Sequence, residues 1–119
     1  MLITGGTSGI GRATAVAFAE QGAKVVIAGR RETEGAESVA LEFAAKGVRV
    51  NAVCPAIIET DMTERIRSND QTRSYLLERH PIGRFGQPEE VAAAVLYLCS
   101  PGAAFVTGVA LPLDGGFAA

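Results

Sequence analysis

The residues with the clearest chemical meaning lie near the start of the chain, in the segment TGGTSGIG at positions 4–11. The segment follows a short apolar run and precedes an alanine-rich stretch, an order typical of strand, loop and helix. Gly5 can take a positive φ where the chain leaves the strand. Gly9 removes a side chain that would keep an anion from the backbone, and Gly11 permits close packing of helix on strand. Free N–H groups at the start of the helix then favour phosphate binding.

Two hydroxyl groups and two guanidinium groups extend this interpretation. Thr7 and Ser8 add hydrogen-bond donors to the loop, and the next apolar run ends in AGRR. Dinucleotide-binding folds that prefer NAD usually present an acid at that place for the ribose hydroxyls. A guanidinium pairs instead with a 2′-phosphate, so Arg30 and Arg31 favour NADP(H) over NAD(H). The alternatives are a tight turn without a ligand and two solvated arginines.

The other titratable side chains predict no catalytic set. Tyr75 and Arg79 are four residues apart, a spacing that chance gives on any helix. We expect Tyr97 to pack on a helix, His80 to be solvated or to cap a helix, and Asp114 to form a turn. We therefore assign no catalytic residue.

Composition limits the class of protein. The 119 residues have room for one domain, and 48% hydrophobic with 20% charged residues is ordinary for a globular protein. The net charge of −2 argues against nucleic-acid binding. No apolar run approaches the roughly 18 residues of a membrane span, and no signal peptide is recognised.

The two cysteines and the single histidine argue against a metal or disulfide framework. We expect Cys54 and Cys99 to be small buried residues in a reducing compartment, and the protein to be cytoplasmic. No metal site is predicted.

Strands and helices must alternate to position the glycine segment. The helix expected near 32–46 carries an apolar stripe at Ala36, Val39, Ala40, Phe43 and Ala44, and Gly47 ends it. The patterns predict strands at 1–4, 24–28, 48–55 and 108–113, further helices at 8–21 and 88–99, and a polar, helical stretch at 60–79.

This alternation predicts an α/β fold, a doubly wound parallel Rossmann-like sheet with right-handed crossovers and helices on both faces. We expect four strands in the order 2-1-3-4. Such a sheet reverses direction between its first and third strands, which would open a crevice beside the glycine segment.

Five motifs follow one another along the chain: TGGTSGIG, VVIAGR, GVRVNAVCPAIIETDM, PIGRFGQPEEVAAAVLYL and VTGVALPLDGG. Together they resemble the short-chain dehydrogenase/reductase family over nearly all of the chain. The resemblance implies a cofactor loop at the glycine segment, with Arg30 at the adenosine end of the dinucleotide. It implies nicotinamide contacts after the third strand, above all from Ile58 and Thr60, although Ala56 stands where the family usually has glycine. The implied cofactor-binding residues are Gly5, Thr7, Ser8, Gly9, Ile10, Gly11, Arg30, Arg31, Pro55, Ala56, Ile58 and Thr60.

The resemblance also implies an organisation of the chain. We expect a single NAD(P)-binding domain over 1–119, with an amino-terminal dinucleotide-binding half at 1–40 and a carboxyl-terminal part at 41–119. Residues 60–80 resemble the substrate-covering lid of the family. Its last helix and strand form a subunit interface in the family, which implies a homo-oligomer.

The sequence departs from the family in its middle. ETEGAESVA leads directly into LEFAAKGVRVNAV, so the central strands, the catalytic serine and the Tyr-x-x-x-Lys pair of the family are absent. In the family that tyrosine is the general acid/base, and the lysine lowers its pKa. Three functions stay open. The chain is an NADP(H)-dependent oxidoreductase for a small carbonyl or alcohol, a catalytically silent dinucleotide-binding domain, or a fragment that needs a partner chain.

Overall fold

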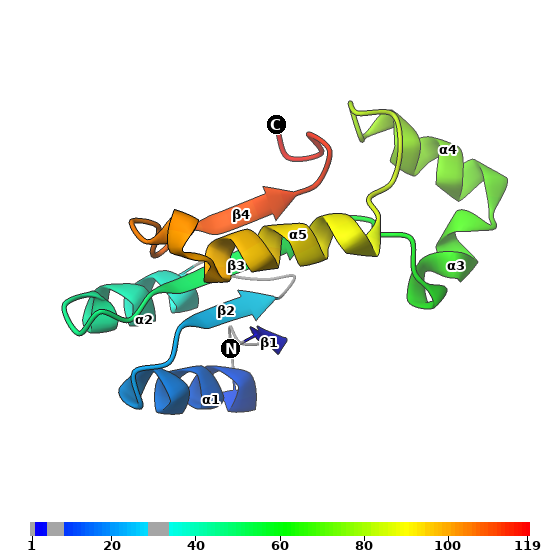
Figure 1. Cartoon of the computed structure of the whole chain (residues 1–119). Coiled ribbons are helices and arrows are strands. Elements are labelled where there is room, and N and C mark those ends of the chain that lie inside the picture. Colours follow the sequence, from blue (N-terminus) through cyan, green and yellow to red (C-terminus); the bar gives the residue numbers. More distant parts are fainter. Residues whose placement is uncertain (1, 5–8, 29–33) are drawn as a thin grey trace.

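The computed structural model describes residues 2–4, 9–28 and 34–119 (Figure 1). The strands of this part are β1 (Leu2–Thr4), β2 (Val25–Ala28), β3 (Val50–Pro55) and β4 (Ala110–Leu113). Its helices are α1 (Gly9–Glu20), α2 (Glu34–Ala44), α3 (Asp61–Arg67), α4 (Asp70–Glu78), α5 (Pro88–Cys99) and the 3-10 turn η1 (Pro101–Ala103). The expected order of strands and helices is confirmed, including the helical character of 60–79.

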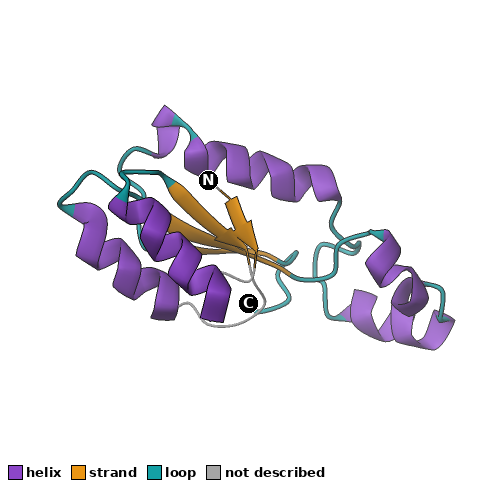
Figure 2. Cartoon of the chain, turned by 90° about the horizontal axis from the view of Figure 1, so that it is seen from below, coloured by secondary structure: helices purple, strands orange, loops and turns teal. Residues whose placement is uncertain are grey.

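The sheet is parallel and covered on both faces. Helices α1 and α2 lie side by side on one face, and α5 lies on the other (Figure 2). The register pairs Ile27 with Ala52 and Val53 with Leu111. Because all strands are parallel, their carboxyl ends meet at one edge of the sheet, where α/β proteins usually bind ligands.

The predicted strand order 2-1-3-4 is wrong. The sheet has the order β1-β2-β3-β4, so β2 lies between β1 and β3. β1 has three residues, and a short strand is suited to an edge, whereas the six-residue β3 pairs along β2 on one side and β4 on the other. The crevice expected between the first and third strands is therefore absent, because those strands are not neighbours.

The expected right-handedness of every crossover is also wrong. The three connections step in the same direction across the sheet, yet α1 and α2 cover one face and α5 covers the other. A sheet whose strands follow in chain order is covered on both faces only when its crossovers differ in hand. The last crossover therefore has the opposite hand to the first two.

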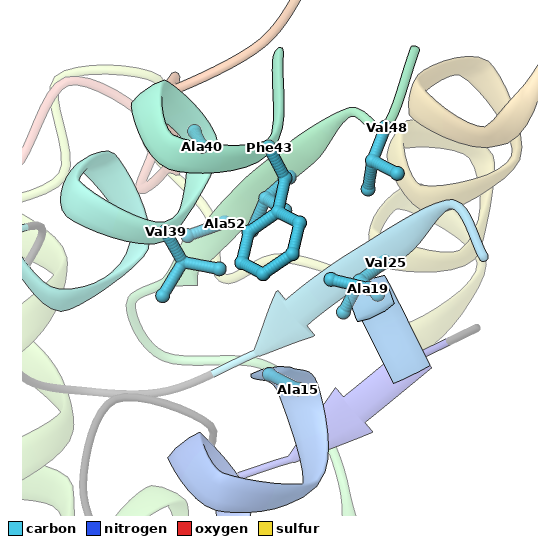
Figure 3. Packing of buried hydrophobic residues seen from close by; sticks show 9 residues of the cluster. Ala15, Ala19, Val25, Val39, Ala40, Phe43, Val48 and Ala52 are labelled. Carbon is cyan, nitrogen blue, oxygen red and sulfur yellow. The ribbon is translucent and has the colours of Figure 1, made fainter. Parts of the chain in front are cut away.

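The larger apolar cluster lies between the sheet and the pair α1 and α2. Figure 3 shows the ring of Phe43 pointing from α2 towards Val25 of β2, with Ala15 and Ala19 of α1 nearby. Val39 and Ala40 are buried beside it, which confirms the core of the predicted stripe. Ala44, at the end of the stripe, is exposed.

Hydrogen bonds of Arg49 and Asn51 hold the segment that leads into β4. Asn51 is buried, its Nδ2 donates to the carbonyl of Val106 at 3.0 Å, and its Oδ1 accepts from the Val109 N–H at 3.2 Å. Arg49 donates to the carbonyls of Val106 and Leu98 at 3.1 and 2.8 Å. These bonds satisfy backbone groups between α5 and β4 and hold both elements on β3.

Replacing Phe43 by alanine is expected to lower the free energy of unfolding by about 3–5 kcal/mol, because it leaves a cavity between α2 and the sheet. Leu41 on the same helix is 80% exposed, so Leu41→Ala is the matched control and is expected to change stability by less than about 0.5 kcal/mol. Urea unfolding followed by circular dichroism measures both. Equal effects of the two substitutions would contradict the packing described.

Candidate functional site

The two described ends of the glycine segment, Thr4 and Gly9, lie at the carboxyl edge of the sheet. β1 ends at Thr4 and α1 begins at Gly9, so the first turn of α1 contains Gly9, Ile10 and Gly11. Thr4 pairs with Ala28, which places the ends of β1 and β2 level with each other. The first turn of a 12-residue helix at this edge offers unpaired N–H groups to an anion. Gly5, Thr7, Ser8, Arg30 and Arg31 lie outside the described residues.

The second group of predicted cofactor contacts follows β3. Ala56 donates its N–H to the carbonyl of Leu113 at 3.2 Å, which extends the pairing of β3 and β4 beyond Pro55. Ile58 lines a pocket at the carboxyl ends of these two strands. Thr60 is exposed, and its N–H donates to Oγ1 of Thr63 at the start of α3. The structure thus brings Ile58 into a pocket and leaves Thr60 at the surface.

This pocket has a volume of about 340 Å³, within the range of small-molecule sites. It lies beyond the ends of β3 and β4 and not between β1 and β3, where the sequence predicted a crevice. Its walls come from the segment after β3, the loop between α4 and α5, the first turn of α5 and the turn after β4. The lining residues are Ile57, Ile58, His80, Ile82, Arg84, Gly86, Glu90, Val91, Pro112, Leu113, Asp114, Gly115 and Gly116.

A close backbone approach at Gly86 forms one wall of the pocket. The Gly86 N–H donates to the carbonyl of Ile57 at 3.0 Å, and the Glu59 N–H donates to the carbonyl of Gly86 at 2.9 Å. A Cβ at position 86 would lie 2.5 Å from Cδ1 of Ile58. The two hydrogen bonds thus pair the α4–α5 loop with the segment that follows β3.

An ion pair between Arg84 and Glu90 forms the charged part of the pocket lining. The two guanidinium nitrogens Nη1 and Nη2 of Arg84 donate to the two carboxylate oxygens of Glu90 at 2.8 and 2.6 Å. The Gln87 N–H donates to Glu90 Oε2 at 2.7 Å, at the start of α5. Hydrogen bonds from Arg84 and then from Gln87 lower the pKa of Glu90 to about 2, and Glu90 in turn raises the pKa of Arg84.

His80 is the pocket residue that the sequence reasoning missed. A solvated or a capping histidine was expected: the residue is 3% exposed and so not solvated, whereas its hydrogen bond to the last turn of α4 confirms the cap. Its Nδ1 lies 2.7 Å from the carbonyl of Leu76, one turn back on α4. Its ring meets Phe85 edge-on at 5.6 Å between centroids, and Phe117 lies at 5.2 Å. Phe117 is far from His80 in the chain, so its part in this burial has no local sequence signal.

The turn after β4 forms another wall of the pocket. Asp114 accepts the N–H groups of Gly116 and Ala118 at 3.0 and 3.1 Å, which confirms the predicted turn. The Ile82 N–H donates to the carbonyl of Gly115 at 3.1 Å. Gly115 has φ +57°, and a Cβ there would lie 2.5 Å from Cγ2 of Ile82. The end of the chain is thus attached to the α4–α5 loop.

Neither tyrosine lies in the pocket. Tyr75 is 56% exposed, and the guanidinium of Arg79 lies over its ring at 5.2 Å. Tyr97 is 50% exposed on α5, so the packing expected for it is incomplete. Cys54 and Cys99 are partly buried, and burial raises the pKa of the Cys54 thiol.

Within the described residues no three His, Cys, Asp or Glu side chains gather as metal ligands. None of the described helices has the length and apolar character of a membrane span.

Comparison with known families identifies the chain. The family model of enoyl-(acyl carrier protein) reductases matches residues 34–118, and that of short chain dehydrogenases matches residues 1–40. The chain belongs to the short-chain dehydrogenase/reductase family. The two matches overlap within α2, the helix whose apolar stripe crosses the point where the sequence departs from the family.

Among curated relatives, this chain is 49% identical over 80 residues to the 3-oxoacyl-[acyl-carrier-protein] reductase of Vibrio harveyi. The matched residues make up 67% of this chain and 32% of that protein. This chain is 45% identical over 80 residues to the galactitol 2-dehydrogenase of Cereibacter sphaeroides, with 67% and 32% covered. The chain thus spans about a third of the length of the curated relatives it matches.

Solved structures of the family share the fold. One is an Agrobacterium tumefaciens protein with bound NADP, provisionally assigned as a 2-deoxy-D-gluconate 3-dehydrogenase. Its TM-score is 0.77 at 30% identity, with 90% of this chain and 52% of that chain covered. A 4-hydroxyisoleucine dehydrogenase with NADH has a TM-score of 0.75 at 25% identity, with 89% and 52% covered. Of these two similar structures, one thus holds NADP and the other NADH.

Replacing Arg84 by methionine is expected to raise the pKa of Glu90 from about 2 towards the ordinary 4.5, because the guanidinium that donates to the carboxylate is removed. Since the folded-state pKa is lowered, the pair stabilises the fold above about pH 4.5, and the contribution is lost as the pH falls towards 2. A carboxyl carbon-13 NMR titration of Glu90 measures the midpoint. Arg73→Met on α4 is the control, and an unchanged Glu90 midpoint in Arg84→Met would contradict the pairing.

Proposed function

We propose that this chain is the dinucleotide-binding part of a short-chain oxidoreductase and that it binds NADP(H) in preference to NAD(H). The observation that supports binding is the position of the glycine segment, between the end of β1 at Thr4 and the start of α1 at Gly9. A helix that begins at this edge of a parallel sheet suits a pyrophosphate. When bound, the dinucleotide would supply hydride chemistry, and the chain would supply binding and orientation.

The preference for NADP(H) is supported by the register of β1 and β2. Thr4 pairs with Ala28, so the segments that follow the two strands start side by side. Arg30 and Arg31 come two and three residues after Ala28 in the sequence. A guanidinium at this place suits the 2′-phosphate that distinguishes NADP from NAD.

We do not propose that this chain alone converts a substrate. Its tyrosines are Tyr75 and Tyr97, neither is followed four residues later by lysine, and both are about half exposed outside the pocket. Substrate, a homo-oligomer through α5 and β4, and a cytoplasmic location stay predictions from the sequence.

Fluorescence titration of the 119-residue chain with NADPH and NADH tests the proposal. We expect saturable binding of both, with NADPH about tenfold tighter, since charge-assisted hydrogen bonds to a 2′-phosphate are among the stronger ones. The double substitution Arg30→Gln with Arg31→Gln is expected to make the two affinities nearly equal.

Two controls make the outcome specific. Arg73→Gln removes an exposed cation on α4 and is expected to leave both affinities unchanged. Gly9→Val places a branched side chain at the start of α1 and is expected to weaken both dinucleotides alike. Absence of binding to either dinucleotide by the folded chain would overturn the proposed function.

A further inference from the structure

A second pocket, which goes beyond the proposed function, lies at the amino-terminal edge of the sheet. It has a volume of about 420 Å³, in the range of small-molecule sites. Its walls come from the loop before β2, the loop between α2 and β3, and the segment between α5 and β4. The arrows of the strands in Figure 1 point away from this edge, and the pocket shares no lining residue with the one around Ile58.

Three polar side chains lie in a row where the chain enters β2, β3 and β4. Val25 pairs with Val50 in neighbouring strands, and its N–H donates to the Arg49 carbonyl at 3.1 Å. Lys24 and Arg49, which directly precede the paired residues, therefore lie side by side. On the other side of β3, Oγ1 of Thr107 accepts the Val50 N–H at 3.2 Å. Neighbouring strands are about 4.8 Å apart, so the row is close enough for one ligand to meet all three side chains.

The charged groups in this row have the same sign. Lys24 and Arg49 are both cationic at neutral pH, and the described lining contains no Asp or Glu. Arg49 donates to the neutral carbonyls of Val106 and Leu98, so within the described residues no carboxylate balances its charge. Like charges on neighbouring strands repel each other. An anion bound beside them would offset this repulsion.

Hydrogen-bond donors for such an anion are present in the same row. Arg49 has guanidinium N–H groups beyond the two that bind the backbone, and Lys24 brings an ammonium group. Oγ1 of Thr107 accepts a backbone N–H, and its O–H has no acceptor in the described part of the chain. Ser100, the other hydroxyl of the lining, already donates to the carbonyl of Tyr97 at 2.7 Å.

The remaining walls are apolar. Ala44 and Val48 come from the end of α2 and the loop that follows it, and Pro101, Ala104 and Phe105 come from η1 and the segment after it. The Phe105 side chain is fully exposed. An apolar ligand body that covers this ring would bury surface from both partners, which favours binding.

We propose that this pocket binds a small carboxylic acid with an apolar body, in its ionised form. The carboxylate accepts hydrogen bonds from Lys24, Arg49 and Thr107, and a guanidinium matches a carboxylate in geometry as well as in charge. The apolar body lies against Phe105. The site depends on β2 lying next to β3, since that pairing brings Lys24 beside Arg49.

The test uses phenylacetate as the probe and phenylacetamide as its matched control, because the two are similar in size and differ in charge. In the uniformly nitrogen-15-labelled chain, the backbone amide signals of Gly47 and Thr107 report on the pocket. We expect phenylacetate to shift both signals saturably. Phenylacetamide is expected to bind about tenfold more weakly, because it cannot accept charge-assisted hydrogen bonds as an anion does.

The variant Lys24→Met removes one cation of the row and keeps an unbranched side chain at an exposed position, where a substitution is tolerated. We expect it to bind phenylacetate about tenfold more weakly and phenylacetamide nearly unchanged. Lys46→Met is the matched control, because it removes the other lysine, which lies over the ring of Phe43 and does not line the pocket. Equal affinity of Lys24→Met and the unaltered chain for phenylacetate would overturn the proposal.

The variant Phe105→Ala tests the apolar part of the site. Phe105 is fully exposed, so we expect the variant to fold like the unaltered chain. It is expected to bind both probes about threefold more weakly, because the contact between two aromatic rings is lost. Unchanged affinity for both probes would overturn the placement of the apolar body.

The unaltered chain also decides between this site and other anion sites. No saturable shift with phenylacetate, or equal affinity for the two probes, would overturn the proposal. Inorganic phosphate binding as tightly at the same signals would overturn it, because the apolar body would then contribute nothing. Displacement of phenylacetate by NADPH would overturn it as a separate site. Failure of NADPH to bind while phenylacetate binds would overturn the proposed function and support this site.

Discussion

Backbone pairing between β2 and β3 holds together two parts of the chain that match different family models. Val25 to Ala28 pair with Val50 to Val53, and α2 connects the two strands across one face. The pairing places Val25 and Val50 in one cluster with Phe43. Burial of this cluster is what allows a chain whose match covers only about a third of its curated relatives to form one four-stranded sheet in the part that is described.

The same pairing separates the two candidate sites. β2 lies between β1 and β3, so the glycine segment at the end of β1 and the pocket at the ends of β3 and β4 are at different places along one edge. With about 4.8 Å between neighbouring strands, the ends of β1 and β3 are about 10 Å apart.

Local patterns predicted the elements well, because they depend on neighbouring residues. The stripe through Val39, Ala40 and Phe43 predicted the buried face of α2, and Pro88 with Glu89 and Glu90 predicted the start of α5. Asp114 before two glycines predicted a turn that the structure contains. The strand order was wrong, because it depends on which long-range pairing buries the most surface, and no local pattern encodes that choice.

For the same reason, local patterns did not predict the pocket. Ile58 was predicted as a contact by resemblance to the family, but the burial of His80 against Phe85 and Phe117 was not. The burial of His80 depends on Leu76, the loop before α5 and the end of the chain together. Such a site becomes visible once the tertiary structure is known.

The strand order is the central claim, and nuclear Overhauser contacts between backbone protons of neighbouring strands test it most directly. In the uniformly labelled 119-residue chain, the structure predicts contacts between Ile27 and Ala52 of β2 and β3. Backbone contacts between Ile3 of β1 and β3, with none between β2 and β3, would contradict it.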